Sequence, residues 1–104
     1  KEDCITFLER VGHKIATVHV SDYDFVDERH WLPGEGKLDW TQLYNGLQKC
    51  GYNGVWMYEL GFKSPRTLTR SRNLDFNDFY NNAMEIMSGK PLTVVPGEKH
   101  PELL

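Results

Sequence analysis

The chain has 104 residues, of which 39% are hydrophobic, 12% aromatic and 26% charged, and its formal net charge is −3. These values are typical of a globular domain and exclude an intrinsically disordered chain. The sequence has no apolar run near the roughly 20 residues that span a membrane, no apolar leader segment, and no basic excess for nucleic acid. We therefore expect a cytoplasmic protein without membrane or nucleic-acid partners, in which Cys4 and Cys50 are buried thiols.

The first part of the chain predicts a helix, a strand and a loop. Apolar residues recur at helical spacing between Asp3, a capping residue, and Gly12, which favours a helix end. The β-branched and apolar run at 15–21 is typical of a buried strand. Residues 22–38 are polar and contain a Pro-Gly-Glu-Gly turn signal, so they predict a long loop.

A second helix is expected between Asp39, its N-terminal cap, and Gly51, which occupies the place of a C-terminal cap. Its apolar stripe, expected to be buried, consists of Trp40, Leu43, Tyr44, Leu47 and Cys50. Residues 55–60 then predict a second buried strand, and residues 61–74 a basic loop. We interpret the loop's arginines, at 66, 70 and 72, as a solvated surface rather than a phosphate site.

A third helix is expected between Asp75 and Gly89. The apolar face that we expect it to bury consists of Phe76, Phe79, Tyr80, Ala83 and Met87. The tail beyond this helix contains three prolines, which predict an extended segment that packs on a neighbour or frays.

The resulting order is helix, strand, helix, strand, helix. Two strands joined through a helix are parallel and right-handed in nearly all proteins, and a parallel sheet has both faces covered. Two strands cannot achieve this by themselves, so an α/β fold that is part of a (β/α)₈ TIM barrel is favoured, with about two of its eight βα units. We expect residues 1–90 to form the C-terminal part of such a barrel and residues 91–104 an extended tail.

Strand parity brings two polar residues to one place. His19 shares a face with Ile15 and Thr17, and Glu59 shares a face with Val55 and Met57. Both polar residues lie near the C-terminal ends of their strands, where the catalytic groups of a barrel collect. An imidazole and a carboxylate together suit Mn²⁺, Co²⁺, Zn²⁺ or Fe²⁺, with Mg²⁺ less suited to a histidine. Two ligands are an incomplete set, so the others would come from earlier strands or another chain.

Several short motifs follow one another between residues 14 and 62. They are His19-Val20-Ser21-Asp22, Arg29-His30, Pro33-Gly34-Glu35-Gly36, Asp39-Trp40, Gly51-Tyr52-Asn53-Gly54 and Glu59. In this order and at this spacing they resemble the last two βα units of the xylose isomerase-like barrel superfamily. Within it, the sugar phosphate isomerase/epimerase group is the most similar.

This resemblance implies roles for individual residues. His19 would be a metal ligand, and Glu59 a metal ligand that also moves a proton next to the substrate's carbonyl, through an enediolate. Arg29 or His30 would contact hydroxyl or phosphate groups of a sugar or sugar phosphate. Asp22 either supports His19 from a second shell or caps the following turn. The family's other two ligands and its second proton-transfer glutamate have no counterpart here, so the chain is expected to be inactive alone.

Two alternatives stay open at this point. One is a zinc phosphodiesterase like endonuclease IV, although Glu28-Arg29-His30 stands here in place of that enzyme's Asp-Arg-His. The other is a fragment without catalysis of its own, which would associate with copies of itself or with a missing N-terminal part. Self-association would bury the barrel-facing residues Ile15, Thr17, Val55 and Met57.

Overall fold

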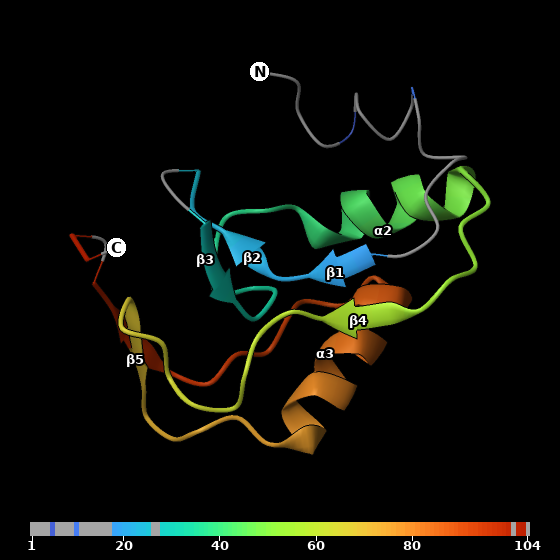
Figure 1. The fold of residues 1–104 in the computed structure, drawn as a ribbon. Helices are drawn as coiled ribbons and strands as arrows, with labels where there is room; N and C mark the ends of the chain where they lie inside the picture. Colours follow the sequence, from blue (N-terminus) through green and yellow to red (C-terminus); the bar gives the residue numbers. More distant parts are fainter. Residues whose placement is uncertain (1–4, 6–9, 11–17, 26–27, 101, 104) are drawn as a thin grey trace.

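A computed structural model describes residues 5, 10, 18–25, 28–100 and 102–103 (Figure 1). Ile5 and Arg10 are helical, while the rest of the expected first helix and residues 15–17 of the expected first strand lie outside the described residues. The elements are β1 (Val18–Val20), β2 (Asp22–Tyr23), β3 (Glu28–Trp31), α2 (Trp40–Lys49), β4 (Trp56–Tyr58), β5 (Leu68–Arg70), α3 (Phe76–Ser88) and β6 (Gly97–Lys99). No helix in these ranges is long and apolar enough to cross a membrane.

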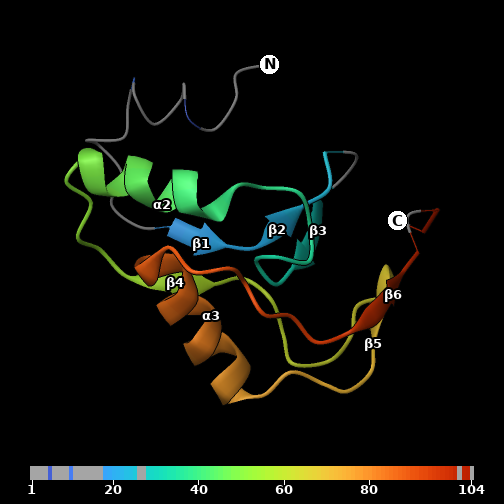
Figure 2. The same ribbon diagram turned by 180° about the vertical axis from the view of Figure 1, so that it is seen from behind.

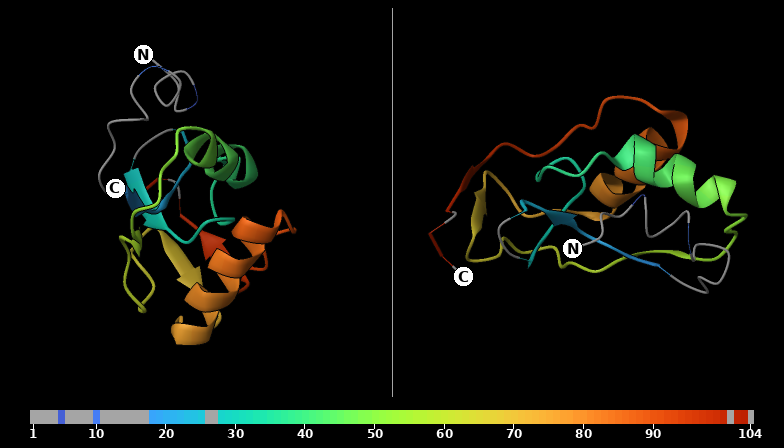
Figure 3. Two further views of the ribbon diagram at one scale, coloured as in Figure 1. Left: turned by 90° about the vertical axis from the view of Figure 1, so that its right-hand side faces the viewer. Right: turned by 90° about the horizontal axis from the view of Figure 1, so that it is seen from above.

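The predicted parallel strand pair is confirmed. β1 pairs in parallel with β4, with His19 opposite Met57 and Val20 opposite Tyr58. The connection between them passes through α2, and α2 and α3 both cover one face of the pair (Figures 1 and 3). The chain is therefore a small α/β unit whose sheet is covered on one side.

The main core lies between this sheet and the two helices. Its buried centre is formed by Val20, Trp40 and Ile86. Trp56 packs edge to face on Trp40, and their ring centroids are 6.3 Å apart. Such aromatic pairs add about 0.5–1.5 kcal/mol to the free energy that apolar burial provides. Val18 and Val20 of β1 and Trp56 and Tyr58 of β4 thus point into the core, while His19 and Met57 point away, as the alternation of side chains along a strand requires.

The predicted N-terminal and C-terminal boundaries of α2 and α3 are present. The Asp39 carboxylate accepts a hydrogen bond from the Gln42 amide at 3.0 Å, and Gly51 follows α2 with a φ of +78°. Asp75 forms a capping box at the start of α3, and Gly89 ends that helix in the left-handed conformation. The apolar stripe of α2 is also as predicted, because Trp40, Leu43, Tyr44, Leu47 and Cys50 are all buried or half-buried.

The predicted buried face of α3 is partly wrong, because Phe79 and Ala83 are half-buried but Phe76, Tyr80 and Met87 are exposed. Phe76 and Tyr80 are 74% and 57% exposed, whereas Asn82 and Ile86 are each 1% exposed. Asn82 faces inward because its side chain accepts a hydrogen bond from the Tyr58 hydroxyl at 2.9 Å and donates one to the Pro33 carbonyl at 2.8 Å. A pattern based on apolar residues alone does not identify an asparagine that faces inward. The predicted face was therefore centred away from Asn82 and Ile86.

The two predicted loops and the tail also contain strands. Within residues 22–38, β2 and β3 form an antiparallel pair. Within residues 61–74, β5 pairs antiparallel with β6 from the tail, so the tail folds back onto its own chain (Figure 2). A second small core of Leu32, Leu74 and Val95 lies beneath these segments. These short strands were missed because tertiary contacts, rather than local propensity, specify them.

The two faces of α3 provide a matched test of this packing. Ile86→Ala should lower the free energy of unfolding by about 2–4 kcal/mol, because it leaves a cavity in the main core. Met84→Ala, on a position that is 45% exposed, should cost less than about 1 kcal/mol. Urea unfolding followed by circular dichroism measures both. Equal losses at the two positions would contradict the observed orientation of α3.

Candidate functional site

The predicted pair His19 and Glu59 lies together on the face of the sheet opposite the helices. His19 is in β1, and Glu59 directly follows β4, where its amide donates to the Val20 carbonyl at 2.8 Å. The His19 Nδ1 and Glu59 Oε1 atoms are 3.7 Å apart, and the two side chains are 53% and 46% exposed. His19 and Glu59 thus lie on the same face of the strand pair, as the sequence predicts, and both side chains are accessible to solvent.

The same face carries exposed apolar residues beside the pair. Val55 is 60% exposed and Met57 is 48% exposed, and Met57 lies opposite His19 in the strand register. Large apolar side chains at the centre of a parallel sheet are normally covered. This open face is therefore where further protein or a ligand would lie.

The donor set of His19 and Glu59 fits a divalent cation. Bonds of about 2.1 Å to nitrogen and to oxygen allow two donor atoms up to about 4.2 Å apart to share an ion, and 3.7 Å is within that limit. Within residues 18–25, 28–100 and 102–103, no group of three or more His, Cys, Asp or Glu side chains could hold a metal ion. A cation held by this pair would take its remaining ligands from elsewhere.

Asp22 is the first residue of β2, one residue after β1, and it is buried. Its Oδ2 accepts hydrogen bonds from the amides of Gly34 and Gly36, both at 2.8 Å, and its Oδ1 accepts from Tyr23 at 2.7 Å and Leu38 at 3.2 Å. A Cβ atom at position 36 would lie 2.5 Å from Oδ1, so only glycine fits there. Asp22 thus makes the contacts with the turn that one of its two expected roles requires, and its support of His19 stays a prediction.

A buried ion pair holds the same turn from the other side. The Arg70 guanidinium donates to both carboxylate oxygens of Glu35, at 2.7 and 2.9 Å, and the two side chains are 1% and 3% exposed. Glu35 Oε1 also accepts a hydrogen bond from the Leu32 amide at 2.7 Å. The interpretation of Arg70 as a solvated residue is therefore wrong. Arg70 lies two residues after Leu68 and so on the same side of a strand, which could have indicated that it is buried. The sequence did not show that its partner is Glu35, which is 35 residues away.

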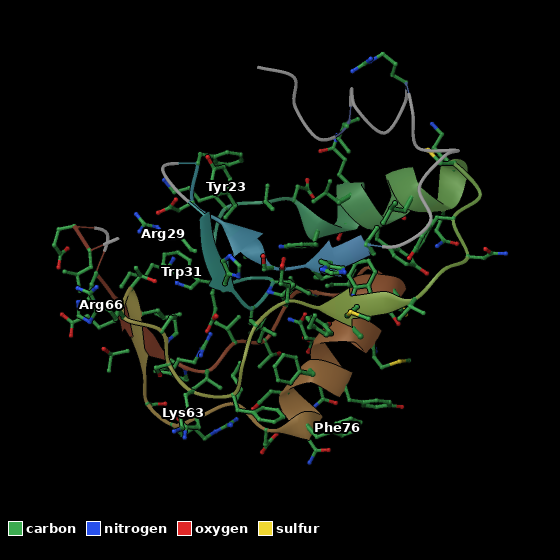
Figure 4. The ribbon with its side chains drawn as sticks, viewed as in Figure 1. Tyr23, Arg29, Trp31, Lys63, Arg66 and Phe76 are labelled. Carbon is green, nitrogen blue, oxygen red and sulfur yellow. The ribbon has the colours of Figure 1, made fainter. Side chains whose placement is uncertain are left out.

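Arg29 and His30, the predicted substrate contacts, have different surroundings. Arg29 is 3% exposed; its Nε donates to Asp24 at 2.8 Å and its Nη1 to the Leu103 carbonyl at 2.7 Å (Figure 4). His30 is exposed, with a φ of +57°, and its Nδ1 is 3.3 Å from the Glu59 carbonyl oxygen. Only His30 thus lies beside the predicted pair. Its left-handed backbone is uncommon outside glycine, although histidine adopts it more often than most residues.

Tyr58 connects β4 with α3 and the turn. Its hydroxyl donates to Asn82, whose amide donates to the Pro33 carbonyl. Burial raises the pKa of the Tyr58 phenol to about 12, against a smaller lowering by the neighbouring Trp56 indole. Asn82 and Tyr58 were not singled out in the sequence, because their importance depends on a contact between distant segments.

Comparisons with known proteins place these features in context. A family model described as xylose isomerase-like TIM barrel matches residues 2–77. The fructoselysine 3-epimerase of Escherichia coli O157:H7 is 30% identical over 59 residues, which are 57% of this chain and 22% of that protein. The fructoselysine 3-epimerase of Shigella flexneri is 30% identical over 59 residues, or 21% of its length. The matched region is thus about a fifth of these curated relatives, and no solved structure matches the chain.

The Asp22 carboxylate gives a direct test of the turn. Asp22→Asn keeps the size but puts an NH₂ group against amides that already donate, so we expect a loss of about 3 kcal/mol in the free energy of unfolding. Asp39→Asn is the matched control, since asparagine caps a helix as well as aspartate does and should cost only a few tenths. Chemical denaturation compares the two. A loss at position 22 no larger than at position 39 would contradict the four-amide arrangement.

Tyr58 predicts a pH dependence of stability. Its pKa is about 12 in the folded protein and about 10 in the unfolded chain. The neutral phenol's contribution is therefore complete below pH 10 and is lost as the pH rises from about 10 to about 12. The difference in unfolding free energy between the parent and Tyr58→Phe, measured by urea titration from pH 8 to 12, should narrow across this window. A difference that stays constant would show that Tyr58 ionises equally in both states.

Proposed function

The chain belongs to the xylose isomerase-like TIM barrel family, and from this membership we propose that it is the C-terminal part of a divalent-metal-dependent sugar or sugar phosphate isomerase or epimerase. The observation that supports the proposal most is the 3.7 Å approach of His19 Nδ1 and Glu59 Oε1 on the open face of the sheet. Both relatives named above carry the name of a sugar-derivative 3-epimerase. That name favours epimerisation over phosphodiester cleavage by an enzyme like endonuclease IV.

The proposed chemistry is movement of a proton on the carbon beside a carbonyl. His19 and Glu59 would hold a Mn²⁺, Co²⁺, Zn²⁺ or Mg²⁺ ion, which when bound polarises the substrate's carbonyl as a Lewis acid. Glu59 would also take the proton or return it, since a carboxylate within hydrogen-bond reach of the C–H serves as a general base. The Glu59 carboxylate is half-exposed at a strand end whose amide is bound to Val20, which supports this role because a substrate could approach it.

The backbone around Glu59 supports its role as a positioned base. Its amide is bound to Val20 in the neighbouring strand, and its carbonyl contacts the His30 ring. The strand end is therefore held from two sides while the carboxylate remains open. For the substrate's hydroxyl or phosphate groups we propose His30 as the contact. Arg29 is less suited, because its guanidinium is buried between Asp24 and the Leu103 carbonyl.

Activity is proposed for the completed barrel and not for this chain alone. The chain supplies two adjacent parallel strands and two of the ligands, whereas divalent ions of this type usually take three or more protein ligands. Its matched region spans about a fifth of the relatives' length. We propose that the remaining strands supply the other ligands and the second proton-transfer group.

Metal binding by the pair is testable on the chain as it is. Titration with Mn²⁺ should broaden the NMR signals of the His19 ring before those of His100, which lies beside Thr69 and serves as the internal control. Glu59→Gln should weaken this selective broadening at least about tenfold, because an amide is a much poorer ligand than a carboxylate. Equal broadening of both rings, or no effect of Glu59→Gln, would contradict the proposal.

A further inference from the structure

His30 is exposed, but the residues on either side of it in β3 are both buried. Arg29 and Trp31 are two residues apart, and the Arg29 Cζ atom lies 5.9 Å from the centroid of the Trp31 ring. Both side chains point toward β5 and the end of the chain (Figure 4). The contacts of these two buried side chains therefore determine where the exposed imidazole between them lies.

Arg29 connects β3 with the last residues of the chain. Its Nη1 donates to the Leu103 carbonyl at 2.7 Å, although the two residues are 74 positions apart in the sequence, and its Nε donates to Asp24. The Leu103 amide in turn donates to the His100 carbonyl at 3.0 Å, which holds this carbonyl in place. Hydrogen bonds from a charged donor are among the stronger ones in proteins, so the tail fixes one neighbour of His30.

The tail also holds the neighbour on the other side of His30. The Lys99 Nζ atom lies 5.5 Å from the centroid of the Trp31 ring, within the range of a cation–π interaction. The Trp31 indole donates to the Thr67 hydroxyl at 3.0 Å, and the Thr67 carbonyl accepts from the His100 amide at 2.8 Å. The antiparallel pairing of β5 with β6 fixes this arrangement. Both neighbours of His30 are thus held by residues of the tail or of the strand paired with it.

We propose that the tail, through residues 97–100 and 102–103, positions His30 beside Glu59, and that Arg29 and Lys99 are the positioning residues. The His30 Nδ1 atom lies 3.3 Å from the Glu59 carbonyl oxygen, so a shift of β3 would move the imidazole away from the site. The inference rests on the proposed function, in which His30 contacts the substrate, and deepens it by naming the segment that sets this contact.

The tail lies outside the region on which the family membership is based. The family model matches residues 2–77, whereas β6 and the residues after it begin at Gly97. Membership of the family therefore does not by itself predict this role for the tail. A group that contacts a substrate acts only when its surroundings hold it in place, so a segment outside the site can affect the reaction.

The test follows the position of the imidazole by NMR in the metal-free 104-residue chain. The signal is the nuclear Overhauser effect (NOE) between the carbon-bound ring protons of His30 and the backbone protons of Glu59 and Leu60. Leu103→Pro removes the amide that holds the Leu103 carbonyl in place, and should lower this NOE at least about twofold, because a lost hydrogen bond from a charged donor changes which conformer predominates. The control, Leu103→Ala, keeps the backbone bonds and should leave the NOE within about a tenth of the parent value.

A second pair of variants tests the contact with Trp31. Lys99→Met keeps a long side chain but removes the cation, and should lower the NOE by about a fifth or more. Lys99→Arg keeps a cation that stacks on an indole and should retain the parent NOE. All four variants should melt within about 2 °C of the parent, since neither Leu103 nor Lys99 belongs to a core cluster. A changed NOE then reports the position of His30 and not unfolding.

Three results would overturn the inference: an NOE that Leu103→Pro leaves unchanged, an equal fall in both Leu103 variants, or equal NOEs in the two Lys99 variants. The outcome is separate from that of the proposed function because no metal is present. The expected NOE changes without selective Mn²⁺ binding would contradict the proposed function alone. Selective Mn²⁺ binding with an NOE that no variant changes would contradict this inference alone.

Discussion

The buried Asp22 carboxylate is the interaction on which the rest of this structure depends. It accepts hydrogen bonds from four backbone amides, including those of Gly34 and Gly36, and is almost completely removed from water. A buried carboxylate is stable only when such donors replace its hydration. It begins β2, one residue after the end of β1, so its bonds to Gly34, Gly36 and Leu38 require the chain to turn back onto this point. The segment between β1 and α2 is consequently held in one conformation by these hydrogen bonds.

Two further contacts join the turn to distant parts of the chain. Glu35 at its centre is held by Arg70 of β5, and Pro33 at its start is bound through Asn82 to Tyr58 of β4. Breaking a buried ion pair by removing one partner typically costs about 3–5 kcal/mol, so these contacts strongly favour one arrangement. All of them lie at the C-terminal ends of β1 and β4. The fold thereby fixes the place where a barrel of this family collects its catalytic groups.

Sequence patterns predicted the helix caps and the parallel strands of this structure, but not the contacts between segments that are distant in the sequence. The caps at Asp39 and Asp75, the parallel strands and the shared face of His19 and Glu59 follow from local propensity and from side-chain alternation, and each is present. The pairing of β5 with β6 and the inward side of α3 depend on partners many residues away. A single sequence shows residue types and spacing but not which buried polar groups satisfy one another. Asn82, for this reason, was indistinguishable from a surface residue.

We propose that an imidazole and a carboxylate on neighbouring strands, those of His19 and Glu59, share one cation. Anomalous X-ray scattering from crystals of the chain grown with Mn²⁺ would locate such an ion. We expect a peak within about 2.0–2.4 Å of both His19 Nδ1 and a Glu59 carboxylate oxygen. A peak at another group of residues, or His19 and Glu59 turned apart with no peak between them, would contradict it.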